Sequence, residues 1–241
     1  MTVQLAKPAR GSVPLHLTDR ASFAEHTVGL DAAAKRWLQT LNFSAAPDTF
    51  ALLPAADGKL AAVWAGVRDV QHPWALSALP KQLPAGAYHL AEPGLALKPG
   101  AAALSWELGG YTFDLYKPAP REAAVLNLPP TAEARRALIV AAAVASTRDL
   151  VNTPAEHMGP AELAEAVRLV AKQHGAKFRQ VVGDKLLAEN FPAVHAVGRA
   201  AARAPRLIEL NWGNPRHPKL ALVGKGVCFD SGGLDIKPAD G

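Results

Sequence analysis

The chain has 241 residues, of which 49% are hydrophobic and 20% are charged, a composition typical of folded globular proteins and not of disordered ones. Its net charge of +5 is moderate and its lysines and arginines are scattered, which disfavours nucleic acid as a partner. One cysteine excludes an internal disulfide framework and a thiolate metal cage. No signal-like or membrane-spanning apolar segment is found, so the sequence predicts a cytoplasmic protein that has no membrane partner.

The first part of the chain, residues 1–117, predicts a small α/β domain. Short apolar runs at 50–53 and 60–64 indicate strands, and amphipathic stretches at 21–39 and 69–83 indicate helices. The segment that follows, 118–130, is rich in proline and is typical of an interdomain linker.

Residues 131–241 predict the beginning of a second α/β domain. Thr131 is expected to cap a buried helix that runs to about Leu150, and Pro160 and Gly175 are expected to begin and end the next helix. The remaining expected elements are a short helix at 184–189 and strands at 177–182, 193–197, 206–212 and 220–223. The predicted fold class is therefore α/β, with a small amino-terminal α/β domain followed by the start of a mixed α/β-sheet catalytic domain.

Chemically active side chains gather directly after the last expected strand. Lys225 and Asp230 follow the apolar run at 219–223, and ligands of α/β sheets collect just beyond the carboxyl ends of strands. Fully extended, the chain would separate the two Cα atoms by roughly 17 Å. Glycines at 224, 226, 232 and 233 permit the backbone to fold back and bring these side chains to one ligand.

These residue types suit metal-assisted hydrolysis. A lysine beside a divalent metal can act as a neutral amine ligand, which suggests this role for Lys225, and Asp230 would supply a hard carboxylate oxygen. Lys237 could stabilise the oxyanion that forms from a substrate carbonyl. The residue types alone leave an alternative open, namely a glycine-rich strand-to-loop connection with solvated lysines.

A long motif in this region resembles the leucyl aminopeptidase (cytosol aminopeptidase) family. The matching positions are Val223–Val227, Phe229–Leu234 and Ile236–Pro238, and earlier elements at Asn152–Pro154 and Pro205–Leu210 agree. The resemblance spans roughly residues 100–241 and thins toward the amino terminus.

This resemblance implies a two-metal aminopeptidase that releases amino-terminal residues, of the leucine type, from peptides. Lys225 and Asp230 would be metal ligands, Lys237 would be catalytic, and the two divalent ions would be Zn or Mn, with Mg as a further candidate. The resemblance also implies a homohexamer whose active sites face an interior cavity.

The chain departs from the family pattern in one important respect. A further aspartate and an Asn-Thr-Asp-Ala-Glu-Gly-Arg element, which supply the remaining ligands and an arginine in the family, do not occur in these 241 residues. We therefore expect residues 1–241 to be inactive without the missing carboxy-terminal half. Two alternatives stay open: a non-catalytic fragment or interaction module, and a nucleic-acid-binding relative of the family.

Overall fold

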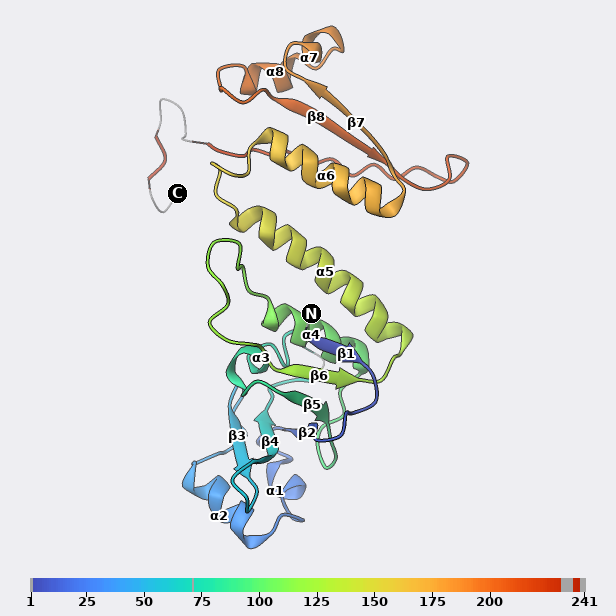
Figure 1. Ribbon diagram of the computed structural model, residues 1–241. Helices are drawn as coiled ribbons and strands as arrows, with labels where there is room; N and C mark the ends of the chain where they lie inside the picture. Colours follow the sequence, from blue (N-terminus) through green and yellow to red (C-terminus); the bar gives the residue numbers. More distant parts are fainter. Residues whose placement is uncertain (1, 71, 231–235, 239–241) are drawn as a thin grey trace. The chain divides into compact units, whose positions relative to one another are not determined.

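A computed structural model of the chain describes residues 2–70, 72–230 and 236–238. The chain divides into two compact units, residues 1–148 and residues 149–241. Both units combine helices with strands (Figure 1), which confirms the predicted α/β class.

The first unit is built on a six-stranded mixed sheet. Its elements are β1 (Val3–Leu5), β2 (Val13–Thr18), α1 (Phe23–His26), α2 (Ala32–Thr40), β3 (Phe50–Pro54), β4 (Leu60–Gly66), α3 (Leu79–Gln82), β5 (Ala87–Leu90), α4 (Pro99–Gly110), β6 (Val125–Leu128) and α5 (Ala132–Asn152), the last of which continues into the second unit. The strand order is β1-β6-β5-β2-β4-β3. All neighbouring strands are parallel except β3, which pairs antiparallel with β4.

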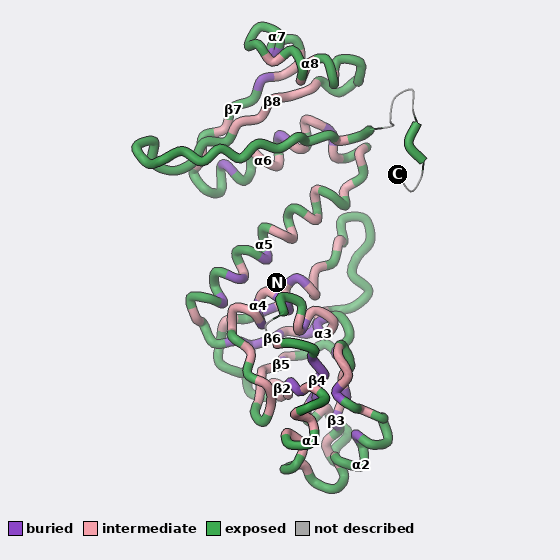
Figure 2. The backbone as a smooth tube through the Cα atoms, turned by 180° about the vertical axis from the view of Figure 1, so that it is seen from behind, coloured by how far each residue is buried: buried purple, intermediate pink, exposed green. Residues whose placement is uncertain are grey.

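The two faces of this sheet bury different side chains because successive residues of a strand point to opposite sides. Leu15 of β2 lies in the main core together with Trp106 of α4, and both are fully buried. The next residue of β2, His16, faces the other way and stacks on Trp64 of β4 at a ring distance of 4.6 Å. Leu38 of α2 packs on this second face. Figure 2 shows that the buried residues of the unit follow the strands of the sheet.

Three expectations for the first unit need correction. The stretch at 21–39 forms two helices, α1 and α2, because Asp31 accepts a hydrogen bond from the Ala34 amide at 2.7 Å and starts a new helix there. The described residues of the stretch at 69–83, which are 69–70 and 72–83, are helical only in α3, since Pro73 disfavours helical backbone at the residue before it.

The third correction concerns the proline-rich segment 118–130. Its last part is β6, which pairs with β1 and β5 inside the sheet and is no linker. Leu126 and Leu128 are buried there. Residues 118–124 contain no helix or strand, and the boundaries at 117 and 130 stay predictions.

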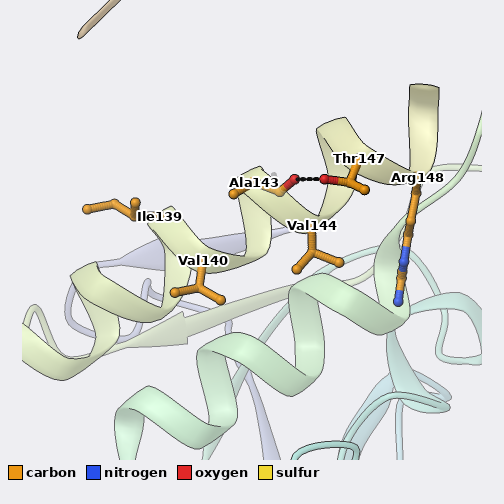
Figure 3. A pocket seen from close by; sticks show the side chains of 6 residues that line it. All are labelled: Ile139, Val140, Ala143, Val144, Thr147 and Arg148. Atoms are coloured by element: carbon orange, nitrogen blue, oxygen red, sulfur yellow. Dashed lines mark hydrogen bonds between the residues drawn. The ribbon is translucent and has the colours of Figure 1, made fainter. Parts of the chain in front are cut away.

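Helix α5 begins as expected but is less buried than expected. The Thr131 hydroxyl accepts a hydrogen bond from the Ala134 amide at 3.2 Å, which confirms the cap. Only the small residues Ala134, Ala137 and Ala141 are buried, whereas the Ile139 side chain is 70% exposed. An apolar hollow therefore lies open along the helix (Figure 3), lined by Ile139, Val140, Ala143, Val144, Thr147 and Arg148.

Close backbone packing at Gly109 of α4 gives a stability prediction. A Cβ at this position would lie 2.1 Å from the carbonyl oxygen of Ser77, a backbone atom that cannot rotate away. We expect Gly109→Ala to lower the free energy of unfolding by roughly 1–3 kcal/mol, because overpacking outweighs the gain in helix propensity. Urea unfolding followed by circular dichroism measures the change. Gly29→Ala is the matched control, since a Cβ there meets nothing within 4 Å; equal effects of both changes would contradict the account.

The second unit consists of a helix packed on a two-stranded sheet. Its elements are α6 (Pro160–His174), β7 (Lys177–Val182), α7 (Lys185–Ala188), α8 (Pro192–Gly198) and β8 (Arg206–Asn211). Strands β7 and β8 are antiparallel neighbours, and α6 contacts both of them. Pro160 begins α6, and Gly175 ends it in the left-handed conformation at φ 65°, as predicted.

Two strands expected in this unit are absent from the residues that the structure describes. The segment 193–197 lies in helix α8, because Pro192 occupies the first helical position and favours a helix start. Residues 220–223 form no strand, and the side chains of Leu220, Leu222 and Val223 are 85%, 90% and 96% exposed. A strand of this kind is stable only when it is paired, and no described strand pairs with these residues.

Candidate functional site

The segment that carries the predicted site residues follows β8 and runs beside α6, as both views show (Figures 1 and 2). It has no helix or strand among its described residues. Gly226 makes the close approach possible: a Cβ at this position would lie 2.9 Å from Cδ2 of Leu163 in the first turn of α6. That the glycines fold the backbone back and bring Lys225 and Asp230 to one ligand stays a prediction, and Gly232 and Gly233 lie outside the described residues.

Two of the three predicted site residues meet directly. The Lys237 ammonium donates a hydrogen bond to Oδ2 of Asp230 at 3.0 Å, and both side chains are 52% exposed. The charged groups are therefore held together in a place that a ligand can reach. An ion pair so exposed contributes only about 0.2–1 kcal/mol to the free energy of unfolding, so stabilisation of the fold does not explain why these two residues are paired.

The third residue, Lys225, is exposed and makes no ion pair within the described part of the chain. The structure brings Asp230 to Lys237 but does not bring Lys225 to either of them. Asp235, between the matching stretches Phe229–Leu234 and Ile236–Pro238, lies outside the described residues.

The side chains of Asp230 and Lys225 are of types that bind divalent metal ions, but two such groups are too few for a two-metal site. Asp230 offers a carboxylate oxygen and Lys225 an amine nitrogen, and both are ligand types of hard or borderline cations. Within residues 2–70, 72–230 and 236–238, no cluster of three or more histidine, cysteine, aspartate or glutamate side chains could hold an ion. A two-metal site would need further carboxylates beside these two groups.

Cys228 stands between the two proposed ligands and is half-buried. Burial raises the pKa of its thiol, and the negative charge of Glu162 raises it further, against a smaller opposing effect of Arg203. A raised pKa favours the thiol form over the more reactive thiolate.

Sequence reasoning missed the group of residues at the start of α6. The Glu162 carboxylate accepts a hydrogen bond from the Gly159 amide at 3.0 Å, which is the half of a capping box that a glycine can make. Arg203 donates to the carbonyl oxygens of Ala155 and Glu156 at 2.9 and 2.6 Å. The pattern Gly159-Pro160-Ala161-Glu162 is the signal that could have found the cap, but nothing in the sequence connects it to Arg203.

Comparison with known families gives two matches that lie side by side on the chain. The profile described as "M17 aminopeptidase, N-terminal domain" matches residues 13–129. The profile described as "Cytosol aminopeptidase family, catalytic domain" matches residues 145–241, which include Lys225, Asp230 and Lys237.

The chain belongs to the cytosol aminopeptidase family. Probable cytosol aminopeptidases of Nocardia farcinica and Rhodococcus jostii are 41% and 36% identical to it over 153 and 160 residues. These alignments cover 58% and 59% of this chain, and 30% and 32% of the two relatives. The family predicted from the motif is confirmed.

Solved structures agree with this assignment. The cytosol aminopeptidase of Coxiella burnetii matches all of this chain with 38% identity and a TM-score of 0.91, and the match covers 52% of that protein. The bottromycin maturation enzyme BotP, solved in complex with Mn, matches 95% of this chain with 27% identity and a TM-score of 0.76, over 51% of its own chain. The chain thus spans about half the length of these structures.

Proposed function

We propose that this protein is a metal-dependent aminopeptidase that releases amino-terminal residues, of the leucine type, from peptides. The observation that supports this most directly is the ion pair between Asp230 and Lys237, in a segment matched by the family's catalytic domain. It holds a carboxylate and an ammonium group together in an accessible place, and metal-assisted attack on a peptide carbonyl needs both kinds of group.

Each of the three residues has a proposed role. Asp230 and Lys225 would hold divalent ions, two in number and either Zn or Mn, with Mg as a further candidate; Mn is supported by its presence in BotP. Such ions, when bound, lower the pKa of water and polarise a carbonyl oxygen. Lys237 would place its ammonium beside the substrate carbonyl, and Asp230 keeps that ammonium in position at 3.0 Å.

Assembly and location are part of the same proposal. We infer a homohexamer that acts in the cytoplasm, as the family resemblance implies. Among the described residues, no helix has both the length and the apolar character that a membrane span requires. Sedimentation velocity of the full-length protein tests the assembly, and a monomer at micromolar concentration would contradict it.

The function itself is tested with leucyl amide as substrate. We expect the full-length protein to hydrolyse it in the presence of Mn²⁺ or Zn²⁺ and to lose this activity after treatment with a chelator. Activity that survives complete removal of metal, verified by elemental analysis, would contradict the metal dependence. Absence of hydrolysis with every metal would contradict the proposed function.

A polypeptide of residues 1–241 alone is expected to be inactive. Among the described residues, Asp230 and Lys225 are the two proposed ligands, and this is fewer than a two-metal centre needs. The exposed side chains of Leu220, Leu222 and Val223 should also make it associate. Leucyl-amide hydrolysis and sedimentation with added Zn²⁺ or Mn²⁺ measure both properties. A soluble, monomeric and active 1–241 polypeptide would overturn the proposed need for further ligands.

A further inference from the structure

Arg203 lies at a junction of three segments of the second unit. Its guanidinium donates to two successive carbonyl oxygens, from Nη1 to Ala155 at 2.9 Å and from Nη2 to Glu156 at 2.6 Å. These bonds connect the loop before β8 to the loop before α6. The planar, forked shape of a guanidinium suits such a double contact, which the single ammonium of a lysine cannot reproduce.

The absence of a side chain at Gly159 makes room for Arg203. A Cβ at Gly159 would lie 2.8 Å from both Cδ and Nη1 of Arg203, and 3.0 Å from Oε2 of Glu162. The arginine therefore packs directly on the backbone at the start of α6, where Glu162 caps the helix. Its position and that of the first helical turn depend on each other.

The first turn of α6 in turn supports the segment that carries the candidate site. Leu163 would be 2.9 Å from a Cβ at Gly226, so this leucine packs on the backbone next to Lys225. Cys228, two residues before Asp230, is half-buried. The contact of Gly226 with Leu163 thus joins this segment to the first turn of α6, whose start packs against Arg203.

We propose that Arg203 is a positioning residue of the aminopeptidase site: through its contacts with Ala155, Glu156 and Gly159 it fixes the start of α6, and thereby the backbone between Lys225 and Asp230. The effect on catalysis rests on the proposed function, whereas the effect on the position of the segment does not. A displaced segment would separate groups that must act together, and errors of about 1 Å in such geometry cost roughly 100-fold in rate.

Cys228 offers a readout that requires neither metal nor substrate. We measure alkylation of this residue by iodoacetamide in the full-length protein, using mass spectrometry of the peptide that contains it. Arg203→Met should speed alkylation about 10-fold, because the segment over α6 opens locally more often. Gly159→Ala should also speed alkylation of Cys228, because the new Cβ displaces the Arg203 side chain. This variant keeps the charge of Arg203.

Two further variants separate positioning from general stability. Arg168→Met removes an arginine whose one ion pair within the described part of the chain is with Glu165, three residues earlier on the same helix. This change should alter the alkylation rate by less than about twofold. Arg203→Lys keeps the charge but can reach only one of the two carbonyl oxygens. Its alkylation rate at Cys228 should therefore lie between those of the wild type and Arg203→Met. Thermal melting by circular dichroism confirms that each variant is folded under the assay conditions.

Kinetics with leucyl amide complete the test. Arg203→Met should lower kcat about 10- to 100-fold with KM nearly unchanged, and Arg203→Lys should restore part of kcat. Unchanged alkylation in both Arg203→Met and Gly159→Ala would overturn the proposed contact network. Faster alkylation with unchanged kcat would overturn the positioning role. If the wild type hydrolyses nothing, the proposed function fails, and the alkylation rates still decide whether Arg203 holds the segment.

Discussion

Asp230→Asn is expected to lower leucyl-amide hydrolysis by the full-length protein by at least about 100-fold, while the protein stays folded. The change replaces a charged oxygen ligand with a neutral amide, which divalent ions bind far more weakly. Stability should change little, because Asp230 is half exposed and its ion pair with Lys237 is a surface one. Elemental analysis should show fewer metal ions per chain, and thermal melting should remain close to that of the wild type.

A matched control for this substitution is Asp57→Asn. Asp57 also forms an exposed ion pair with a lysine, Lys59, at 3.0 Å, but it lies in the turn between β3 and β4 of the first unit. This variant should retain full activity and metal content. Equal metal content in wild type and Asp230→Asn would show that Asp230 is no ligand, even if activity fell.

Replacement of Lys237 is expected to impair catalysis, whereas replacement of Lys225 is expected to impair metal binding. Lys237→Ala should lower kcat by about 100- to 1,000-fold with metal content unchanged, because it removes a charge that stabilises the oxyanion. Lys225→Ala should weaken metal binding, so that its activity recovers in part when the metal concentration is raised. Titration of activity against Mn²⁺ or Zn²⁺ separates the two effects.

Lys219→Ala serves as the control for both lysines, since Lys219 is exposed in the same segment and has no proposed role. Its kinetics should match the wild type. Turnover at the wild-type rate by both Lys225→Ala and Lys237→Ala would refute their assignment to the site. If Lys237→Ala needed a higher metal concentration for activity and Lys225→Ala did not, then Lys237 would be the metal ligand and Lys225 the residue that stabilises the oxyanion.

The sequence predicted best those parts of the fold whose signals are local. Thr131 at the start of α5, and Pro160 and Gly175 at the ends of α6, act through their own backbone geometry, and the structure confirms each of them. Strands β7 and β8 lie where strands are predicted at 177–182 and 206–212, and the two strands pair with each other. The family motif likewise identified the segment that brings Asp230 to Lys237.

The errors arose where the outcome depends on partners far away in the chain. The run 220–223 has the composition of a buried strand but lies exposed, because no described strand pairs with it. The proline-rich composition of 118–130 hid β6, whose burial comes from β1 and β5 on either side. Arg203 could not be found either, since its partners lie nearly 50 residues earlier.

The central claim, that the protein removes residues from the amino terminus of peptides, is tested most directly by product analysis. The full-length protein with Mn²⁺ or Zn²⁺ is incubated with a peptide that begins with leucine, and separately with the same peptide acetylated at its amino terminus. The masses of the products are then measured by mass spectrometry. We predict loss of the amino-terminal residue from the free peptide and no cleavage of the acetylated one. Cleavage of both peptides at an internal bond, or of neither with any metal, would contradict the account.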